Sequence, residues 1–257
     1  MSDATIDVAG ERLTLLPEKA LFWEREKTLM IADAHFGKSA TFRAHHIPIP
    51  EGNLKADLAR LTTAARSALA DADALLLEDY NKGALAPALI MAVMEVAKRR
   101  GIPIVVDPKY RQFFEYSGAT VFKPNRRELE SALGAAVDLQ DGGALPEVLT
   151  RLKVDNLLVT LGPEGMVLVT KDGNLTQIPS IARKIYDVSG AGDTVTAWLG
   201  TAMAAGASVS EAAQLANYAA GVEVGKPGVA TVSPDEVLAV HEERFDQIGR
   251  LRRGGLI

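Results

Sequence analysis

The 257-residue chain has no cysteine and only four histidines. Without cysteine it has neither a disulfide framework nor a thiolate zinc site. It also lacks any apolar run of the roughly 20 residues that a membrane-spanning helix needs. The opening sequence MSDATIDVAGERL has no basic segment followed by an apolar stretch, as a secretory signal would. A formal charge of −5 gives no electrostatic footprint for sequence-independent binding of nucleic acid, which usually needs a basic face. We therefore expect a cytoplasmic protein that binds neither nucleic acid nor membranes.

From about Leu75 onward, strand-like apolar runs alternate with helical patterns. The hydrophobic content of 47% is enough for a substantial core. The predicted helices are Pro87 to Arg100, 191 to 205 and about 209 to 222. The predicted strands are 75–77, 104–106, 120–122, 156–160, 166–170 and 175–178. This alternation is typical of an α/β fold with a mostly parallel sheet covered by helices.

Polar residues follow several of the predicted strands. Ligands of an open parallel sheet collect outside the carboxyl ends of its strands. The residues expected at those ends are Asp79, Asp107, Asn125 and Gly162. We therefore expect these residues to converge.

A turn rich in small residues, Asp187 to Thr194, runs directly into the apolar helical pattern that begins at Val195. The first N–H groups of a helix have no intrahelical partner, and together with the helix dipole they favour a bound phosphate. Asp193 lies in the same turn, where its carboxylate could take a proton from a hydroxyl that attacks the phosphate. The loop thus indicates phosphoryl transfer. The alternative is a plain helix start, with Asp193 as a favourable N-terminal charge.

Residues from Asp73 to about Val237 resemble the C-terminal, nucleotide-binding half of PfkB-type, ribokinase-like sugar kinases. Within that family they look most like the kinases that phosphorylate D-glycero-D-manno-heptose 7-phosphate at O1. The resemblance rests on Asp79-Tyr80-x-Lys82-Gly83, Asp107-Pro108-Lys109, Tyr116-Ser117-Gly118-Ala119-Thr120 and Gly225-Lys226-Pro227-Gly228. It implies a three-layer, Rossmann-like sheet with helices on both faces. It also implies an enzyme of carbohydrate metabolism that transfers phosphate from Mg-ATP to a hydroxyl of a sugar phosphate.

The resemblance assigns roles to the turn before the helix. Asp193 would be the catalytic base, and Asp187 and Ser189 would flank a loop that holds a monovalent cation such as K⁺. The amides of the anion hole would be those of Gly190, Ala191 and Gly192.

Other assignments concern the nucleotide. Asn125-x-x-Glu128 resembles the N-x-x-E element that places Mg²⁺ and phosphate, but an asparagine cap with a glutamate three residues later is also an ordinary capping box. Thr160-x-Gly162-x-x-Gly165 resembles the nucleotide-binding strand and turn.

Two single residues each have two interpretations. Asn217 resembles a residue near the adenine, and the alternative is a surface position on a helix. Lys109 could meet a phosphate, and the alternative is a solvated lysine after a proline turn.

Residues of about 10–66 resemble instead the start of a calcineurin-like metallophosphoesterase of the ligase-associated type. The matching stretches are Leu16 to Trp23, Ile31 to Lys38, Thr41 to Ala44 and Ile47 to Gly52. Asp33-x-His35, at the end of a predicted strand from Thr28 to Ala32, would be the first metal motif, and Asp79 could supply a bridging aspartate. The later histidine motifs of that family are absent, so the metal ligand set is incomplete. The sugar-binding residues and β-sheet lid of the kinases are not recognisable here.

A helical stripe that begins at Leu54 and ends at Leu69 joins the two resemblances. We expect one compact α/β domain of mixed ancestry over 1–257, with a phosphoesterase-like segment (1–70), a kinase-like segment (72–243) and a solvated tail (244–257). The leading hypothesis is a sugar kinase that lacks the lid and has a replaced acceptor half. The alternatives are a nucleotide-binding chimera without turnover and a metal-dependent phosphoesterase. The sequence leaves the oligomeric state open.

Overall fold

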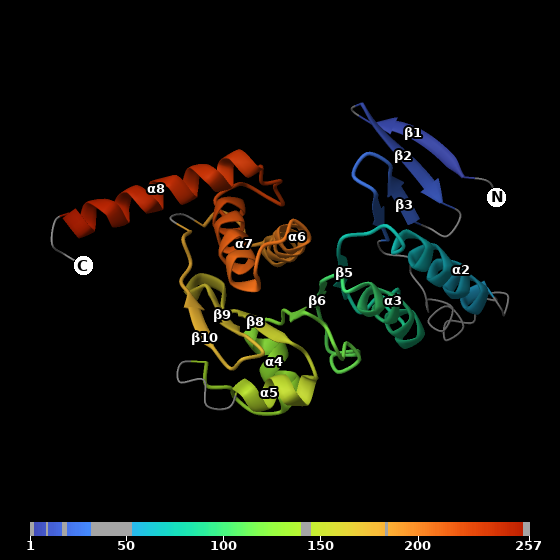
Figure 1. Ribbon diagram of the computed structural model, residues 1–257, viewed down its shortest axis with the longest axis horizontal. Helices are drawn as coiled ribbons and strands as arrows, with labels where there is room; N and C mark the ends of the chain where they lie inside the picture. Colours follow the sequence, from blue (N-terminus) through green and yellow to red (C-terminus); the bar gives the residue numbers. More distant parts are fainter. Residues whose placement is uncertain are drawn as a thin grey trace. The chain divides into compact units, whose positions relative to one another are not determined.

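The computed structural model describes residues 3–8, 10–16, 20–31, 53–139, 145–182 and 185–253 (Figure 1). The chain divides into two compact units, Met1–Thr120 and Val121–Ile257. The boundary at Thr120 lies inside the kinase-like segment. The expectation of one compact domain over 1–257 stays a prediction.

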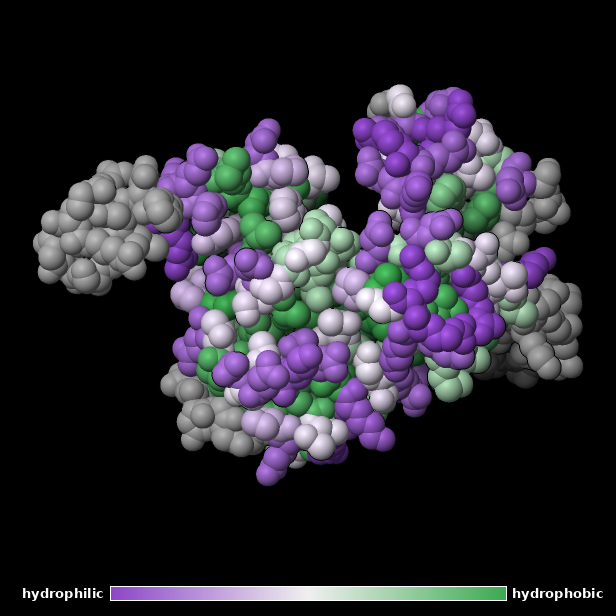
Figure 2. All heavy atoms as spheres, in the orientation of Figure 1, coloured by the Kyte–Doolittle hydropathy of each residue, from purple (hydrophilic) through white to green (hydrophobic). Residues whose placement is uncertain are grey.

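The first unit begins with a small antiparallel sheet of four strands in the order β1-β2-β3-β4. Its strands are β1 (Ala4–Val8), β2 (Glu11–Leu16), β3 (Ala20–Trp23) and β4 (Thr28–Met30). Every residue of β1 is exposed, and Ala20 is the one fully buried residue among these strands. Figure 2 shows a mainly hydrophilic surface over this sheet. The sequence analysis predicted only the last strand, so a small sheet is present in the segment where no β-sheet lid was recognised.

The rest of the first unit alternates helices with parallel strands. Helix α2 (Asn53–Ala68) precedes β5 (Leu75–Glu78), and α3 (Pro87–Arg100) leads to β6 (Ile104–Asp107), which pairs in parallel with β5. Helix α3 has proline at its start and ends on Gly101, whose φ of 68° is the left-handed conformation that glycine adopts readily. Both strands and helix α3 confirm the prediction.

The second unit contains strands in the order β10-β9-β8-β7. Strand β7 (Val121–Phe122) pairs in parallel with β8 (Asn156–Thr160), and β9 (Met166–Val169) and β10 (Leu175–Ile178) follow antiparallel. The other elements are α4 (Arg126–Leu133), α5 (Leu145–Leu152) and the short 3₁₀ helix η1 (Gly162–Glu164). All of β9 and all but the last residue of β8 are buried. These strands are therefore the core of this unit.

Three helices complete the second unit. Helices α6 (Ala191–Ala204) and α7 (Val209–Glu223) pack against each other, and α7 opens with the predicted capping box of Ser208 and Glu211. Helix α8 (Pro234–Arg253) starts with a similar exchange of hydrogen bonds between Ser233 and Glu236.

The backbone of α8 is helical through Arg253. The first ten residues of the expected tail, 244–253, are therefore helical, and their expected exposure to solvent stays a prediction. Among the described residues, no helix is long and apolar enough to cross a membrane.

Candidate active site

The turn before α6 has the backbone geometry of an anion-binding helix start. Gly190 is the N-cap in the left-handed conformation, with φ of 91°. The Thr194 N–H donates to the Gly190 carbonyl at 2.8 Å, which closes the first turn of the helix. Ahead of it, the Ser189 N–H donates to Oδ1 of Asp187 at 2.9 Å. The turn is therefore held by its own backbone and by the Asp187 side chain.

The surroundings of Gly190, as well as its φ, disfavour a side chain at this position. A Cβ atom added there would lie 3.1 Å from Cγ1 of Val229 and 3.3 Å from Oε1 of Glu223. Both distances are shorter than ordinary contacts, so a side chain at this position would push these neighbours away. The glycine leaves room where the chain approaches the helix start.

Asp193 lies exposed in the first turn of α6. The structure thus brings the predicted base into the same helical turn as the three predicted anion-hole residues, Gly190, Ala191 and Gly192. Their catalytic roles remain predictions.

Asp187 is held in its charged form. Hydrogen bonds from the backbone and the side chain of Ser189 lower the pKa of the Asp187 carboxyl. An ionised carboxylate beside an exposed Ser189 suits the predicted cation loop.

The Asn125-x-x-Glu128 motif forms a complete capping box at the start of α4. Oδ1 of Asn125 accepts from the Glu128 N–H, and Oε2 of Glu128 accepts from the Asn125 N–H, both at 2.9 Å. Asn125 also forms a parallel bridge with Thr160, whose N–H donates to Pro124 at 3.1 Å. The capping-box interpretation is confirmed. The bridge between Asn125 and Thr160 also makes the two predicted nucleotide motifs, which begin at these residues, adjacent.

The turn after β8 is tightly built around Gly165, which has φ of 99° and ψ of −129°. A Cβ atom there would lie 2.1 Å from the Ile178 carbonyl oxygen and 2.5 Å from the Ser180 nitrogen. Only glycine fits this close approach of two backbones. Gly162, with φ of 61°, has open space around its Cα.

Asn217 faces the same stretch of backbone, 178–180. Its side chain is 6% exposed, and Nδ2 donates to the Pro179 carbonyl at 3.0 Å. The interpretation as a surface position is therefore wrong, because Asn217 belongs to the buried alanine-rich face of α7. A polar residue among Ala213, Ala216 and Ala219 was the sequence signal for this burial.

Asp79 in the first unit is 5% exposed and fully engaged in hydrogen bonds. Oδ2 accepts from the Tyr116 hydroxyl at 3.1 Å, and Oδ1 accepts from the Asn81 N–H at 2.7 Å. The Asp79 N–H donates to the Asp107 carbonyl at 2.9 Å. Burial, and then the charge of Asp79, raise the pKa of Tyr116, so the phenol remains a donor.

Three of the quoted motifs therefore meet in the first unit, through Asp79, Asp107 and Tyr116. Tyr116 was quoted only as part of a motif, and its burial was not anticipated. Lys109 is half-buried, with Nζ 3.9 Å from Oδ1 of Asp107, which differs from a freely solvated lysine.

The proposed phosphoesterase ligands do not form a described site. Asp33 and His35 lie outside the described residues, and both carboxylate oxygens of Asp79 already accept hydrogen bonds.

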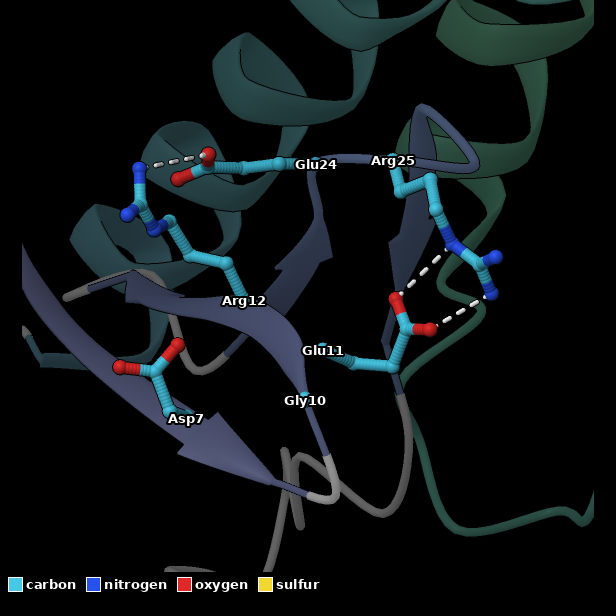
Figure 3. Close-up of a pocket in the computed structure, with 6 residues that line it drawn as sticks. All are labelled: Asp7, Gly10, Glu11, Arg12, Glu24 and Arg25. Carbon is cyan, nitrogen blue, oxygen red and sulfur yellow. Dashed lines mark hydrogen bonds and ion pairs between the residues drawn. The ribbon is translucent and has the colours of Figure 1, made fainter.

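A shallow depression in the N-terminal sheet carries charged side chains (Figure 3). Arg25 pairs with Glu11, with 2.6 Å between Nη2 and Oε1, and Nη1 of Arg12 lies 3.8 Å from Oε2 of Glu24. Each arginine already faces a carboxylate. The depression is therefore a surface of ion pairs rather than an anion-binding site.

Residues 47–236 match the sequence model of the pfkB family of carbohydrate kinases. Three curated relatives bear the name "Bifunctional protein HldE". The protein of Trichlorobacter lovleyi is 44% identical over 171 residues, 65% of this chain and 34% of its own. That of Geobacter metallireducens is 47% identical over 168 residues (64% and 34%), and that of Rhodospirillum rubrum is 43% identical over 190 (73% and 38%). The chain thus spans about a third of the length of these relatives.

Solved structures show the same fold. Arabidopsis thaliana ribokinase complexed with ribose and ATP matches with a TM-score of 0.61 and 24% identity, over 69% of this chain and 58% of that one. Escherichia coli phosphofructokinase-2 in complex with potassium matches with a TM-score of 0.64 and 19% identity, over 73% and 62%. The expected ribokinase-like α/β fold, with a mainly parallel sheet flanked by helices, is confirmed.

None of these findings supports the metallophosphoesterase resemblance of residues 10–66, and the family match begins at residue 47, inside that segment. For the residues before 47, the resemblance stays a prediction. The match over 190 residues, together with relatives more than 40% identical, shows the family. The chain belongs to the pfkB family of carbohydrate kinases.

Proposed function

We propose that this chain transfers the terminal phosphoryl group of Mg-ATP to a hydroxyl of a sugar phosphate. The start of α6 carries this proposal. A left-handed glycine, the N–H groups of the first helical turn and an exposed carboxylate occur within four residues, Gly190 to Asp193.

The residues of the second unit fit a nucleotide. The first turn of α6 offers N–H groups without an intrahelical partner, and the helix dipole there stabilises negative charge. We assign the turn from Thr160 to Gly165 and the region of Asn217 to the nucleoside part. Glu128, oriented by its capping box, would hold the hydrated Mg²⁺. When bound, Mg-ATP supplies the phosphoryl group and a metal charge that offsets its negative oxygens.

Asp193 would act on the acceptor. Its carboxylate is exposed and would accept the proton of the sugar hydroxyl while that oxygen forms its bond to phosphorus. The amides of Gly190, Ala191 and Gly192 would stabilise the charge that develops on the transferred group.

Asp187 and Ser189 would hold a monovalent cation beside this loop. The hydrogen bonds from Ser189 keep the Asp187 carboxylate charged, as a cation ligand must be. The relative solved with potassium supports K⁺ as the ion.

The acceptor we propose is a heptose 7-phosphate. The support is the identity of about 45% to proteins named HldE, together with the motifs that meet at Asp79, Asp107 and Tyr116. Lys109, a cation in these motifs, would contact the phosphate of the acceptor. We also propose an oligomer, by analogy with a similar solved structure that is described as a tetrameric form of phosphofructokinase-2.

A nucleotide binder without turnover is the second candidate. It is favoured by one observation: the family match begins at residue 47, so the sheet of residues 4–30 lies outside it. Correct placement of the acceptor matters, since an error of about 1 Å can cost roughly a hundredfold in rate.

Release of ADP, measured with Mg-ATP and heptose 7-phosphate, separates the two candidates. A kinase releases ADP only when the acceptor is present. Asp193→Asn should lower that rate by about 10² to 10⁴-fold and still bind Mg-ATP. The matched control is Asp172→Asn, an exposed aspartate in the turn before β10, which should leave the rate unchanged. Stabilisation by Mg-ATP without acceptor-dependent ADP would identify the inert binder.

A further inference from the structure

Two loops of the first unit, residues 79–83 and 107–112, lie side by side. They continue the parallel strands β5 and β6, whose last residues, Glu78 and Asp107, are register partners (Figure 1). The Asp79 N–H donates to the Asp107 carbonyl at 2.9 Å, which carries the pairing one step beyond β5. Ligands of parallel sheets bind at the carboxyl ends of the strands, so the side chains that these loops expose are placed to contact a ligand.

Asn81 joins the two loops. Its backbone N–H donates to Oδ1 of Asp79 at 2.7 Å, and its own Oδ1 accepts from the Arg111 N–H at 3.4 Å. Its φ of 56° is left-handed, and only two other non-glycine residues among those described have a positive φ. This conformation is costly for most residues, although asparagine tolerates it. Glycine would fit the same backbone, but it could not accept a hydrogen bond from the second loop.

The exposed charges of the two loops are all positive. Lys82 directly follows Asn81 and is exposed, and the residue on the other side of the Asn81 hydrogen bond, Arg111, is exposed as well. Both aspartates of these loops are buried. Residues 79–83 and 107–112 therefore present cations to solvent and no exposed carboxylate.

Aromatic rings accompany these cations. Nζ of Lys82 lies 5.9 Å from the centroid of the Tyr80 ring, and the Tyr80 side chain is exposed. Tyr110, the neighbour of Arg111, is exposed too. A sugar phosphate offers an anion for the cations and a C–H face that can pack on an aromatic ring. A phosphorylated sugar is therefore the class of ligand that these loops suit.

We propose that Lys82 and Arg111 bind the phosphate of the acceptor together with Lys109. Asn81 is the positioning residue that holds the loops of Lys82 and Arg111 at a fixed spacing. An arginine can donate two parallel N–H bonds to a phosphate, and a lysine adds a compact charge. This inference deepens the proposed function, on which it rests, because it adds two ligands and a positioning residue to an acceptor site in which Lys109 was the one assigned cation.

Calorimetric titration of the full chain with heptose 7-phosphate tests the two ligands. The Mg²⁺ complex of a non-hydrolysable ATP analogue is present, so that no turnover occurs. Lys82→Met and Arg111→Met should each raise the Kd of heptose 7-phosphate by about 10- to 100-fold, since each removes a charge-assisted hydrogen bond. The Kd of the nucleotide analogue should stay the same. Lys171→Met, which changes an exposed lysine in the turn before β10, is the matched control and should leave both constants unchanged.

Asn81→Gly tests the positioning role. It keeps the left-handed backbone and removes the acceptor of the Arg111 N–H, so the Kd of heptose 7-phosphate should rise about 3- to 10-fold. In combination with Lys82→Met it should add less than this factor, because the effects of residues that act through one another are not additive. Asn174→Gly, the same change at an exposed asparagine of the turn between β9 and β10, should have no effect.

Three results would overturn the site: a wild type that does not bind heptose 7-phosphate, unchanged binding in Lys82→Met and Arg111→Met, or an equal loss of nucleotide binding in both. The positioning role fails if Asn81→Gly keeps the wild-type Kd, or if its effect multiplies fully with that of Lys82→Met.

Release of ADP, measured separately, keeps this proposal distinguishable from the kinase proposal. Acceptor binding that depends on Lys82 and Arg111, without ADP release, would contradict the kinase proposal and leave the phosphate site standing. Acceptor-dependent ADP release with an unchanged Kd in both variants would do the reverse.

Discussion

The N-terminal sheet and the strands of the second unit are built in opposite ways. Strand β1 is exposed along its whole length, whereas every residue of β9 is buried. The N-terminal sheet carries charged pairs such as Arg25 with Glu11, and the second unit is organised by apolar strands and by glycine turns at their ends. The candidate site lies among the glycine turns at the ends of the buried strands. Substitutions there should therefore lower the free energy of unfolding much more than substitutions in the N-terminal sheet.

The largest expected effect is that of Gly165→Ala. The new methyl group would collide with the backbone of residues 178–180, in a conformation that only glycine adopts readily. We expect a loss of about 3 kcal/mol in the free energy of unfolding, measured with urea. The methyl group added by Gly162→Ala would have no neighbour within 4 Å, so this variant should lose only about 1 kcal/mol in the free energy of unfolding. Equal losses would show that the close approach at Gly165 is unimportant.

The two capping boxes separate a structural role from a ligand role. Asn125→Ala and Ser208→Ala each remove a cap and should each cost about 1 kcal/mol of stability. Only Asn125→Ala should also weaken the stabilisation by Mg-ATP. Ser208 caps the start of α7, and no role in nucleotide binding is proposed for it. If both variants keep the full response to Mg-ATP, Asn125 and Glu128 are a helix cap and nothing more.

The buried carboxylate of Glu223 should make stability depend on pH. Its pKa is raised in the folded state above the ordinary value of 4.5. The cost of charging it is absent below that value, grows as the pH rises, and is complete above the folded pKa. In choline buffer, the wild type should therefore lose stability relative to Glu223→Gln as the pH increases from 4 to 8. Melting curves that differ by the same amount throughout this range would contradict the assignment.

The smallest effect is expected in the N-terminal sheet. Arg25→Ala removes an ion pair with Glu11 and a contact over the Trp23 ring, but the arginine side chain is 65% exposed. Exposed pairs contribute little, so we expect a loss of at most about 1 kcal/mol in urea unfolding and an unchanged response to Mg-ATP. A large loss would show that this sheet is held by its charges.

The sequence predicted most of the elements that are marked by an apolar face and by proline or glycine at their ends. Helix α3 appears with its stated bounds because proline starts it, one face is apolar and glycine stops it. The turn into α6 was equally clear, since small residues run straight into an apolar helical pattern. The first three N-terminal strands were missed because β1 is exposed along its length, β2 mixes polar with apolar residues and the apolar run of β3 is only four residues long.

Contacts between residues far apart in the chain could not be predicted from the sequence. Asn217 could be placed inside only by seeing that its alanine neighbours share a buried face, and its partner Pro179 is 38 positions away. The burial of Glu223 follows from the packing of α7 beside the Gly190 turn, which the sequence does not show. In both cases a polar residue was judged by its type, whereas its environment decided its state.

The most direct test of the kinase assignment is thermal unfolding of the full chain with increasing Mg-ATP. A ligand that binds only the folded state must stabilise it, by about 2.7 kcal/mol at a hundred times its Kd. We predict that the midpoint rises steadily with the concentration of Mg-ATP, in the wild type and in Asp193→Asn alike. A midpoint that stays constant up to millimolar Mg-ATP would contradict the account.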